Sequence, residues 1–393
     1  MNSRHPQDFK IKPKELTLLI EILKNKNDED LCHELFIDID WDKFIQLAIH
    51  HRVYPIIYLR LKNKMNKWVP QNVNSALYQK YKKNTFQMLK LSGEMEQVSD
   101  LFTENDIRLL FLKGPAIAAY LYGDISHRTS GDLDILIPIN DIEKAEKLLL
   151  RSGYERMEAA TPLWKIRYHH ITYFHVEKGI QVEIHWRLHP QSLKEPKFNE
   201  LWTRKQKSNF TDHPVYFFGD EDLFLYLVAH GARHGWFRLR WLMDIDQILS
   251  EKMIINENVL SVKEFKNHHL GGDIHFLGQT LILVSQLFNT PLNEAMHILT
   301  EKNRSIKLAK KTIRYIIERA EYDFTMSEVY LAKYHNRYLF NIRSRQQRVI
   351  FIIKLFYPNP KDADTLRLPK SLMFLYFPLR PFLWVWRKVR VSK

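Results

Sequence analysis

The residues best suited to chemistry are Asp132 and Asp134, two acids separated by a single apolar residue. The run from Leu133 to Ile137 is otherwise apolar and stops at Pro138, which is typical of a short buried strand. Residues two apart on a strand point to the same face, so we expect both carboxylates on one side of a sheet. Two such groups repel each other unless a cation neutralises them. Mg²⁺ favours carboxylates together with substrate phosphates, so the pair predicts a magnesium site.

A third acid, Glu183, stands between Val182 and Ile184 in another segment with strand character. If this strand lies near the one that carries Asp132 and Asp134, three carboxylates converge. Such a trio can hold two metal ions about 3.5 to 4 Å apart and stabilise an in-line phosphoryl displacement. We therefore expect all three acids to be metal ligands and catalytic residues.

The chain changes character along its length, and this pattern predicts the elements that position the acids. Residues 1–106 are typical of helices, residues 107–220 combine short apolar strands with short helices, and residues 221–370 are again typical of helices. Residues 371–393 form a basic, aromatic tail. The expected fold class is α+β, with a small mixed sheet as the core and a helical region on each side of it.

Within the core, turn and periodicity signals predict individual elements. Arg108–Leu112 is expected to be a buried strand, and Pro115–Tyr122 a short helix, because proline suits the first helical position and Gly123 the position after the end. Segments 170–175 and 180–185 are expected to form a hairpin, because Lys178 and Gly179 provide a plausible turn.

Composition narrows the class of protein. The 393 residues carry a formal net charge of +14, which indicates an anionic partner or simply a basic surface. Cys32 is the single cysteine, which excludes a disulfide framework and a cysteine zinc site and fits the cytoplasm. Met1–Leu16 lacks the apolar segment of a signal peptide, and no uncharged apolar run is long enough to span a bilayer.

The tail at 371–393 combines aromatic side chains with Arg380, Arg387 and further basic residues. Pro378 and Pro381 argue against a transmembrane helix. A segment of this kind can lie on an anionic membrane surface, which would place the protein at the inner face of the membrane. Alternatively, its aromatic side chains pack back onto the protein.

His230 and His234 lie one helical turn apart, a spacing that can bind zinc. Gly231 occupies the place where a metalloprotease motif requires glutamate, so that class is excluded. We expect the two histidines instead to line the cleft beside basic residues, with Asp244 paired to one of these. The basic residues are Arg233, Arg238 and Arg240.

Several segments together resemble the bacterial uncharacterised nucleotidyltransferase family of the DNA polymerase β-like nucleotidyltransferase superfamily. Members of that family carry a Leu-Lys-Gly turn, an arginine before an Asp-Leu-Asp-Leu-Leu-like strand, and a Glu-x-His-Trp sequence. The resemblance covers about residues 40–250, including the helical segments around His230 and Asp244. The matching segments are Phe111–Gly114, Tyr122–Asp124, Arg128, Asp132–Leu136 and Glu183–Trp186.

The turn Lys113-Gly114-Pro115 departs from the wider superfamily, whose Gly-Gly or Gly-Ser turn uses a serine hydroxyl to hold phosphate. Lys113 can replace that contact, because an ammonium group is a good point-charge partner for phosphate. Gly114 lets the backbone approach the phosphates closely, and the helix N-terminus after it adds positive potential.

Two further residues are candidates for nucleotide binding. Arg128 either contacts the triphosphate, braces the two aspartates, or forms a structural salt bridge. His185 follows Glu183 by two positions and shares its face of the strand, where it either orients a ligand near the metal or serves a structural role.

The resemblance implies a reaction that needs Mg²⁺, with one ion or two. A nucleoside monophosphate would move from a nucleoside triphosphate to an acceptor hydroxyl on a small molecule, a glycan precursor or a protein. The alternative is a non-catalytic nucleotide-binding or regulatory protein with the same fold. The net charge also suggests nucleic acid, but no known readout motif supports it, so we do not expect a nucleic-acid partner.

Overall fold

The chain divides into two compact units, residues 1–342 and residues 343–393. The boundaries expected from the sequence, after residues 106, 220 and 370, stay predictions. The structure, a computed structural model, describes residues 13–24, 31–62, 68–158, 164–190, 195–253, 274–321, 328–343, 348–349, 351–353, 362 and 365–391.

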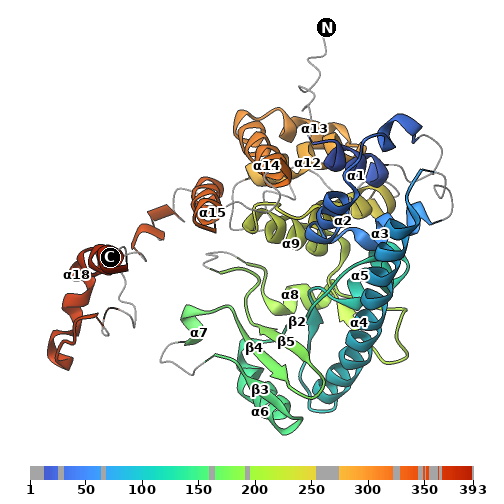
Figure 1. Cartoon of the computed structure of the whole chain (residues 1–393). Coiled ribbons are helices and arrows are strands. Elements are labelled where there is room, and N and C mark those ends of the chain that lie inside the picture. The colour runs from blue at the N-terminus through green and yellow to red at the C-terminus, as the bar shows by residue number, and fades with distance from the viewer. Residues whose placement is uncertain are drawn as a thin grey trace. The chain divides into compact units, whose positions relative to one another are not determined.

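A seven-stranded mixed sheet forms the centre of the first unit, in the order β3-β4-β5-β2-β1-β7-β6 (Figure 1). Strand β2 is parallel to β5 and β1 is parallel to β7, whereas the other neighbouring pairs are antiparallel. The predicted α+β class is confirmed. The strands are β1 Leu110–Phe111, β2 Leu133–Leu136, β3 Tyr154–Arg156, β4 His170–His175, β5 Ile180–His185, β6 Gln206–Lys207 and β7 Tyr216–Phe217.

The register of the central strands decides which polar side chains are neighbours. In the β2–β5 pair, Asp134 stands beside Glu183. In the β4–β5 pair, Thr172 stands opposite Glu183 and His170 stands opposite His185. Because these positions differ by two along each strand, all of these side chains share one face of the sheet.

The opposite face of the same strands is apolar and buried. Ile171 and Tyr173 on β4, and Val182 and Ile184 on β5, are each at most 1% exposed. A shift of one residue in the pairing would move charged side chains into this core, which is strongly unfavourable. The alternation of apolar residues therefore holds the acids on the polar face.

Helix α4, Gln71–Thr103, runs alongside the sheet and packs against α3, α5 and α6 (Figure 1). The side-chain amide of Asn84, buried in this helix, donates hydrogen bonds to the backbone carbonyls of Ser126 and Arg128, over 2.8 and 3.2 Å. These contacts fix the segment that leads into β2, and so they fix the approach to the two aspartates.

Further helices cover the sheet, and α9, α10, α12 and α14 form a connected layer. Figure 1 shows α9, α12 and α14 gathered with α1 and α2 on one side of the sheet. The helices of the first unit are α1 Lys14–Lys24, α2 Trp41–His50, α3 Tyr54–Leu61, α5 Pro115–Tyr122, α6 Ile142–Arg151, α7 Trp164–Arg167, α8 Phe198–Thr203, α9 Asp220–Arg233, α10 Leu239–Gln247, α12 Ile274–Phe288, α13 Glu294–Thr300, α14 Asn303–Glu321 and α15 Glu328–Ile342.

The end of α9 is shaped by a close contact between Gly231 and Trp236. Trp236 is fully buried and has a positive φ of 56°, so the chain folds back on the helix that it has just left. A Cβ atom on Gly231 would overlap the Trp236 ring. The glycine therefore gives the indole ring its room, although glycine weakens a helix interior.

The second unit holds a buried acid, Asp362, between two arginines of α18, Tyr376–Val391. Arg380 Nη1 lies 3.3 Å from Asp362 Oδ2, and Arg387 Nη1 lies 2.7 Å from Oδ1. The predicted tail is thus helical over most of its length. Among the described residues, no helix has the combination of length and apolar character needed to cross a membrane.

The contact between Gly231 and Trp236 predicts a stability effect. Gly231→Ala should lower the free energy of unfolding by about 1–3 kcal/mol, because the added methyl group overpacks a full core. Gly93→Ala is the matched control, since a Cβ at that position in α4 meets no atom within 4 Å. The control should be neutral or gain about 0.5–1 kcal/mol from a better helix former. Urea denaturation of both variants measures the difference, and equal effects would contradict this account.

Candidate metal and phosphate site

Asp134 lies at the centre of the predicted site and is almost fully buried. Lys113 Nζ lies 2.9 Å from its Oδ2 atom, and His185 Nε2 lies 3.1 Å from its Oδ1 atom. Burial alone would raise the pKa of this carboxyl, but the lysine and the histidine outweigh burial and hold the pKa well below its usual range. Asp134 is therefore ionised, with a nitrogen donor at each oxygen.

Asp132 lies near the other acids, and nearby positive groups offset its charge less fully than that of Asp134. It directly precedes β2 and is partly buried. Burial, and after it the charge of Asp134, raises the pKa of Asp132 to about 6, and Lys113 opposes this shift only in part. A carboxyl that is costly to ionise where it stands would be stabilised by an added divalent cation.

Glu183 completes a compact group of donors. Gln181 Nε2 donates to its Oε1 atom over 3.0 Å, and His185 Nε2 lies 3.4 Å from its Oε2 atom. One donor atom from each of Asp134, Glu183 and His185 lies within 4.8 Å of the other two. Strands β2 and β5 are paired, which is the condition that the predicted convergence of acids required. Two carboxylates with one imidazole fit a divalent cation.

The predicted phosphate-binding turn joins β1 to α5. Gly114 has a φ of 99° and a ψ of −156°, a conformation that non-glycine residues rarely adopt. Burial would lower the pKa of Lys113, but the charge of Asp134 raises the pKa above its usual value. The ammonium group thus neutralises Asp134 in this arrangement. Its role as a phosphate contact stays a prediction.

Arg128 is buried, with 1% of its side chain exposed, and forms a bidentate ion pair with Asp244. Its Nε and Nη2 atoms each donate to a carboxylate oxygen over 2.9 Å, and the Tyr122 hydroxyl donates to the same carboxylate. Of the alternatives for Arg128, this geometry favours the structural salt bridge over contact with a triphosphate. The pair ties helix α10 to the segment before β2.

Three more arginines bring positive charge towards the acids. Arg240 interacts electrostatically with Asp132 and donates through Nη1 to the Thr129 carbonyl over 2.9 Å. Arg52 also experiences the charge of Asp132, and Arg233 that of Asp134. Burial lowers the pKa of each guanidinium group, and burial together with the nearby Arg128 lowers that of Arg240 to about 9.

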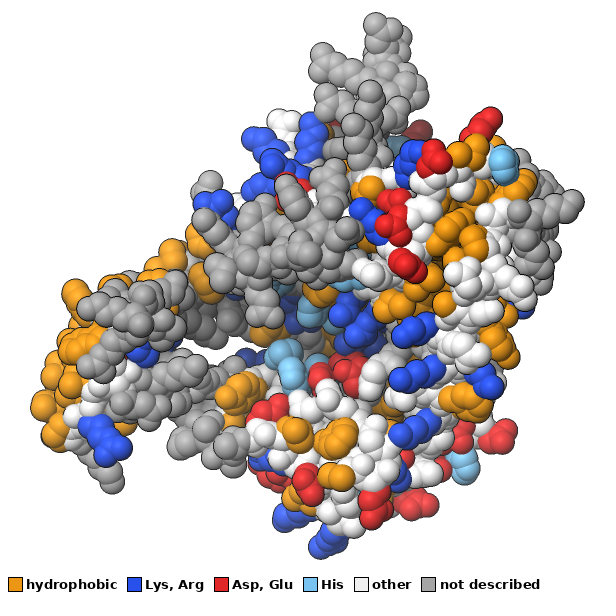
Figure 2. All heavy atoms as spheres, in the orientation of Figure 1, with side chains coloured by type: hydrophobic (Ala, Val, Ile, Leu, Met, Phe, Trp, Pro, Cys, Tyr) orange, Lys and Arg blue, Asp and Glu red, His pale blue; other side chains and the backbone are white. Residues whose placement is uncertain are grey.

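These three arginines favour the binding of an anion. Each remains protonated at neutral pH despite its depressed pKa, and desolvated positive charge is stabilised by a negatively charged partner. Figure 2 shows Lys and Arg side chains gathered beside acidic and histidine side chains in the middle of the face drawn. The arrangement of acids next to arginines suits a metal ion together with phosphate.

His230 and His234 instead belong to an aromatic cluster with Trp241. Their ring centroids are 4.6 Å apart, and that of His234 stacks 5.0 Å from the Trp241 ring. Burial lowers the pKa of both histidines, so both are neutral. Among the described residues, the groups of side chains that could hold a metal ion do not include either of them.

Sequence reasoning missed His169, His170 and Arg52. His170 had a signal, because folding the predicted hairpin about its turn places it opposite His185. His169 had a weaker signal, its place directly before the hairpin. Arg52 lay in a helical region far from the acids in sequence, so only the tertiary structure brings it to Asp132.

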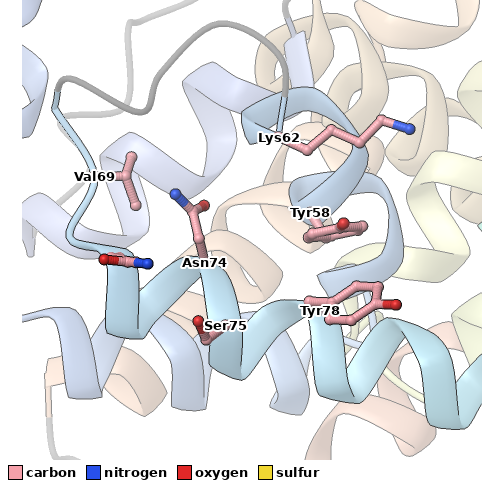
Figure 3. A pocket seen from close by; sticks show the side chains of 7 residues that line it. Tyr58, Lys62, Val69, Asn74, Ser75 and Tyr78 are labelled. Atoms are coloured by element: carbon pink, nitrogen blue, oxygen red, sulfur yellow. The ribbon is translucent and has the colours of Figure 1, made fainter.

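A separate pocket of about 510 Å³ lies between α3 and the start of α4. In Figure 3, Tyr58 and Tyr78 lie beside each other at one side of it, and Asn74 and Ser75 project from α4. Among the described residues of its lining, Lys62 is the one charged residue. The described part of this pocket thus lacks the combination of acids and arginines seen around Asp134.

Comparison with families of known proteins gives a match for this chain. A family model described as uncharacterised nucleotidyltransferase matches residues 38–289, more than half of the sequence. The matched range includes the acids, the Lys113-Gly114 turn and helices α9 and α10. Among curated proteins, nothing matches.

The raised pKa of Asp132 predicts that this acid costs stability. In metal-free protein with chelator, Asp132→Asn should leave unchanged or increase the free energy of unfolding at neutral pH, because asparagine removes the repulsion with Asp134. The folded-state pKa, about 6, lies above the ordinary 3.8. The advantage of the variant should therefore develop as pH rises from about 4 to about 6 and stay constant above.

The matched comparison is Asp134→Asn, which leaves Lys113 without its buried partner. This variant should lose stability at neutral pH, opposite in sign to Asp132→Asn. Denaturant titrations at several pH values measure both. A large loss of stability in Asp132→Asn would show that Asp132 is a structural acid.

Proposed function

Because the chain belongs to the uncharacterised nucleotidyltransferase family, we propose that it transfers a nucleoside monophosphate from a nucleoside triphosphate to an acceptor hydroxyl. The observation that carries the proposal is the register of β2 and β5, which sets Asp134 beside Glu183 with Asp132 close by. A catalyst of this reaction needs such a group of acids next to a phosphate-binding surface.

Asp132, Asp134 and Glu183 are the residues that would hold Mg²⁺. When bound, the ion neutralises phosphate charge and supplies Lewis-acid stabilisation. The donor set supports this assignment, because Asp132 is an acid whose ionisation is costly in the metal-free protein. The proposal accommodates one ion or two.

The basic residues would bind and orient the triphosphate. Arg233 and Arg240 carry charge that buried acids only partly compensate. Lys113 Nζ lies 2.9 Å from Asp134 Oδ2. We infer that this ammonium group moves to a phosphate oxygen when another cation binds Asp134. Positioning and charge neutralisation then supply most of the rate enhancement.

In the transfer itself, the acceptor oxygen attacks the α-phosphorus and forms the new P–O bond. The bond between the α-phosphorus and the bridging oxygen to the β-phosphate breaks, and pyrophosphate leaves with that electron pair. Glu183 either completes the metal site or, where Asp132 and Asp134 alone hold the ion, accepts the hydroxyl proton. Its side chain is 19% exposed and lies at the accessible side of the donor group.

One observation favours the alternative of a non-catalytic nucleotide-binding protein. Lys113 and His185 each place a nitrogen beside one oxygen of Asp134, so the charge of this carboxylate is offset without a metal. Binding of nucleotide without release of pyrophosphate, across a panel of nucleotides and acceptors, would support this alternative.

The proposed chemistry predicts loss of activity in two acid variants. Asp132→Asn and Glu183→Gln should each lower nucleotide transfer by roughly 100-fold or more, because transition-state charge loses its compensation. Asp42→Asn, an exposed acid on α2, is the control. Transfer of label from an α-labelled nucleotide to components of a cell extract, together with pyrophosphate release, measures the reaction. Wild-type rates in either acid variant would refute the mechanism.

We also propose that the tail at 371–393 contacts an anionic membrane surface. Phe374 and Phe382 are 69% and 72% exposed, whereas Tyr376 and Leu383 are buried. Exposed aromatic side chains insert at the level of lipid headgroups, and neighbouring basic residues are attracted to anionic lipid.

A vesicle-binding experiment tests this contact. The double variant Phe374→Ser with Phe382→Ser should bind vesicles of phosphatidylcholine with phosphatidylserine roughly tenfold or more weakly, because two apolar side chains are lost. Phe86→Ser removes an equally large exposed side chain from α4 and should change nothing. Unchanged binding in the double variant, or no binding by the wild type, would refute the proposed membrane contact.

A further inference from the structure

Three histidines meet at the edge of the polar face, next to the carboxylates. His169 and His170 lie at the start of β4, and His185 ends β5. The backbone fixes both places, because the Trp186 amide donates to the His169 carbonyl over 3.1 Å and the Ile137 amide donates to the His185 carbonyl over 3.0 Å. The cluster is therefore built on strand ends rather than on a long loop.

The ring nitrogens are close enough to share one ion. One nitrogen from each of the three rings lies within 4.8 Å of the other two. His169 Nε2 and His170 Nδ1 are 3.2 Å apart. Two nitrogens on a tetrahedral Zn²⁺ lie roughly 3.3 Å apart, because each Zn–N bond is about 2.0–2.1 Å. Small side-chain rotations would close the remaining distance to His185.

The two nitrogens of His185 have different surroundings. Nε2 lies 3.1 Å from Asp134 Oδ1 and 3.4 Å from Glu183 Oε2, so it acts as a donor to carboxylates. Nδ1 is buried and has no hydrogen-bond partner among the described residues. A metal-binding imidazole characteristically gives its other N–H to a carboxylate, which fixes the ring and strengthens the ligand.

We propose that His169, His170 and His185 form a second metal site, which takes Zn²⁺ or a similar borderline divalent cation. Three imidazole nitrogens suit such an ion, whereas Mg²⁺ prefers oxygen ligands. The site shares His185 with the carboxylate group that the proposed transfer would use, but its other two ligands lie outside that group. Binding at the histidine site requires neither nucleotide nor turnover.

Glu183 links the two sites. Its Oε2 atom lies 3.9 Å from His170 Nε2 and 3.4 Å from His185 Nε2. This carboxylate faces the Nε2 atoms of both rings, so it would orient the two imidazoles whose Nδ1 atoms would bind the ion. The same ion would fix the position of the Glu183 side chain beside Asp134.

Metal binding to the full chain tests the proposal. After treatment with chelator, the wild-type protein is titrated with Zn²⁺ against a competing indicator, in the absence of nucleotide. His169→Gln and His170→Gln should each raise the Zn²⁺ dissociation constant by about 100-fold or more, beyond the loss usual for an outer-shell partner. His213→Gln, which changes a histidine that also lies beside an acid, should leave the constant unchanged.

A spectrum of the wild type keeps the test independent of how the variants fold. Co²⁺ in a four-coordinate site of imidazoles absorbs strongly in the visible range, whereas Co²⁺ with six oxygen ligands absorbs weakly. We expect the strong spectrum, and Zn²⁺ should abolish it. The weak spectrum, or equal Zn²⁺ affinity in His169→Gln and wild type, would overturn the proposal.

A further variant separates this proposal from the proposed transfer activity. Asp132→Asn should lose nucleotide transfer but retain Zn²⁺ binding, because Asp132 is outside the histidine cluster. If transfer fails in all conditions while Zn²⁺ binds as described, the proposed function is wrong and the histidine site stands. Loss of Zn²⁺ affinity in Asp132→Asn with none in His169→Gln would place the ion among the carboxylates and overturn the second site.

Discussion

The parallel pairing of β2 with β5 concentrates negative charge on one face of the sheet, and the surrounding structure compensates that charge. Asp134 and Glu183 stand side by side, and Asp132 is close enough for its pKa to rise to about 6. A charge density of this kind costs free energy unless cations offset it. Lys113 and His185 offset part of it within the chain, and the part left at Asp132 is what a bound divalent cation would offset.

The need to offset this negative charge explains why segments that are distant in sequence converge on β2. The approach to β2 is held by Asn84 of α4 and by the buried pair of Arg128 with Asp244. A buried ion pair adds little net stability, but loss of one partner is costly, so such pairs hold a backbone in one arrangement. Helix α10 then carries Arg240 to the acids, which provides the positive charge that a phosphate group requires.

His185 lies between the carboxylate group and the other two histidines, and these two groups suit different metal ions. On one side are carboxylate oxygens, which suit Mg²⁺ and phosphate transfer. On the other side are the imidazoles of His169 and His170, which suit a borderline ion. An ion among the histidines would restrain Glu183, and through it the carboxylate group. The proposed nucleotidyl transfer and the proposed second metal site therefore share one rigid part of the sheet, while each can be tested separately.

The sequence by itself determined the α+β class, the strand that carries Asp134 directly after Asp132, and the hairpin that carries Glu183, because apolar alternation and turn residues are local signals. It also showed the family resemblance, because the motifs are short runs of neighbouring residues that can be read directly from the sequence. Only the tertiary structure decided that Arg128 pairs with Asp244 and that Arg52 approaches Asp132. Such partners depend on how helices pack on the sheet. A contact between residues that are far apart in sequence produces no periodic pattern of residue types, so the sequence alone does not reveal it.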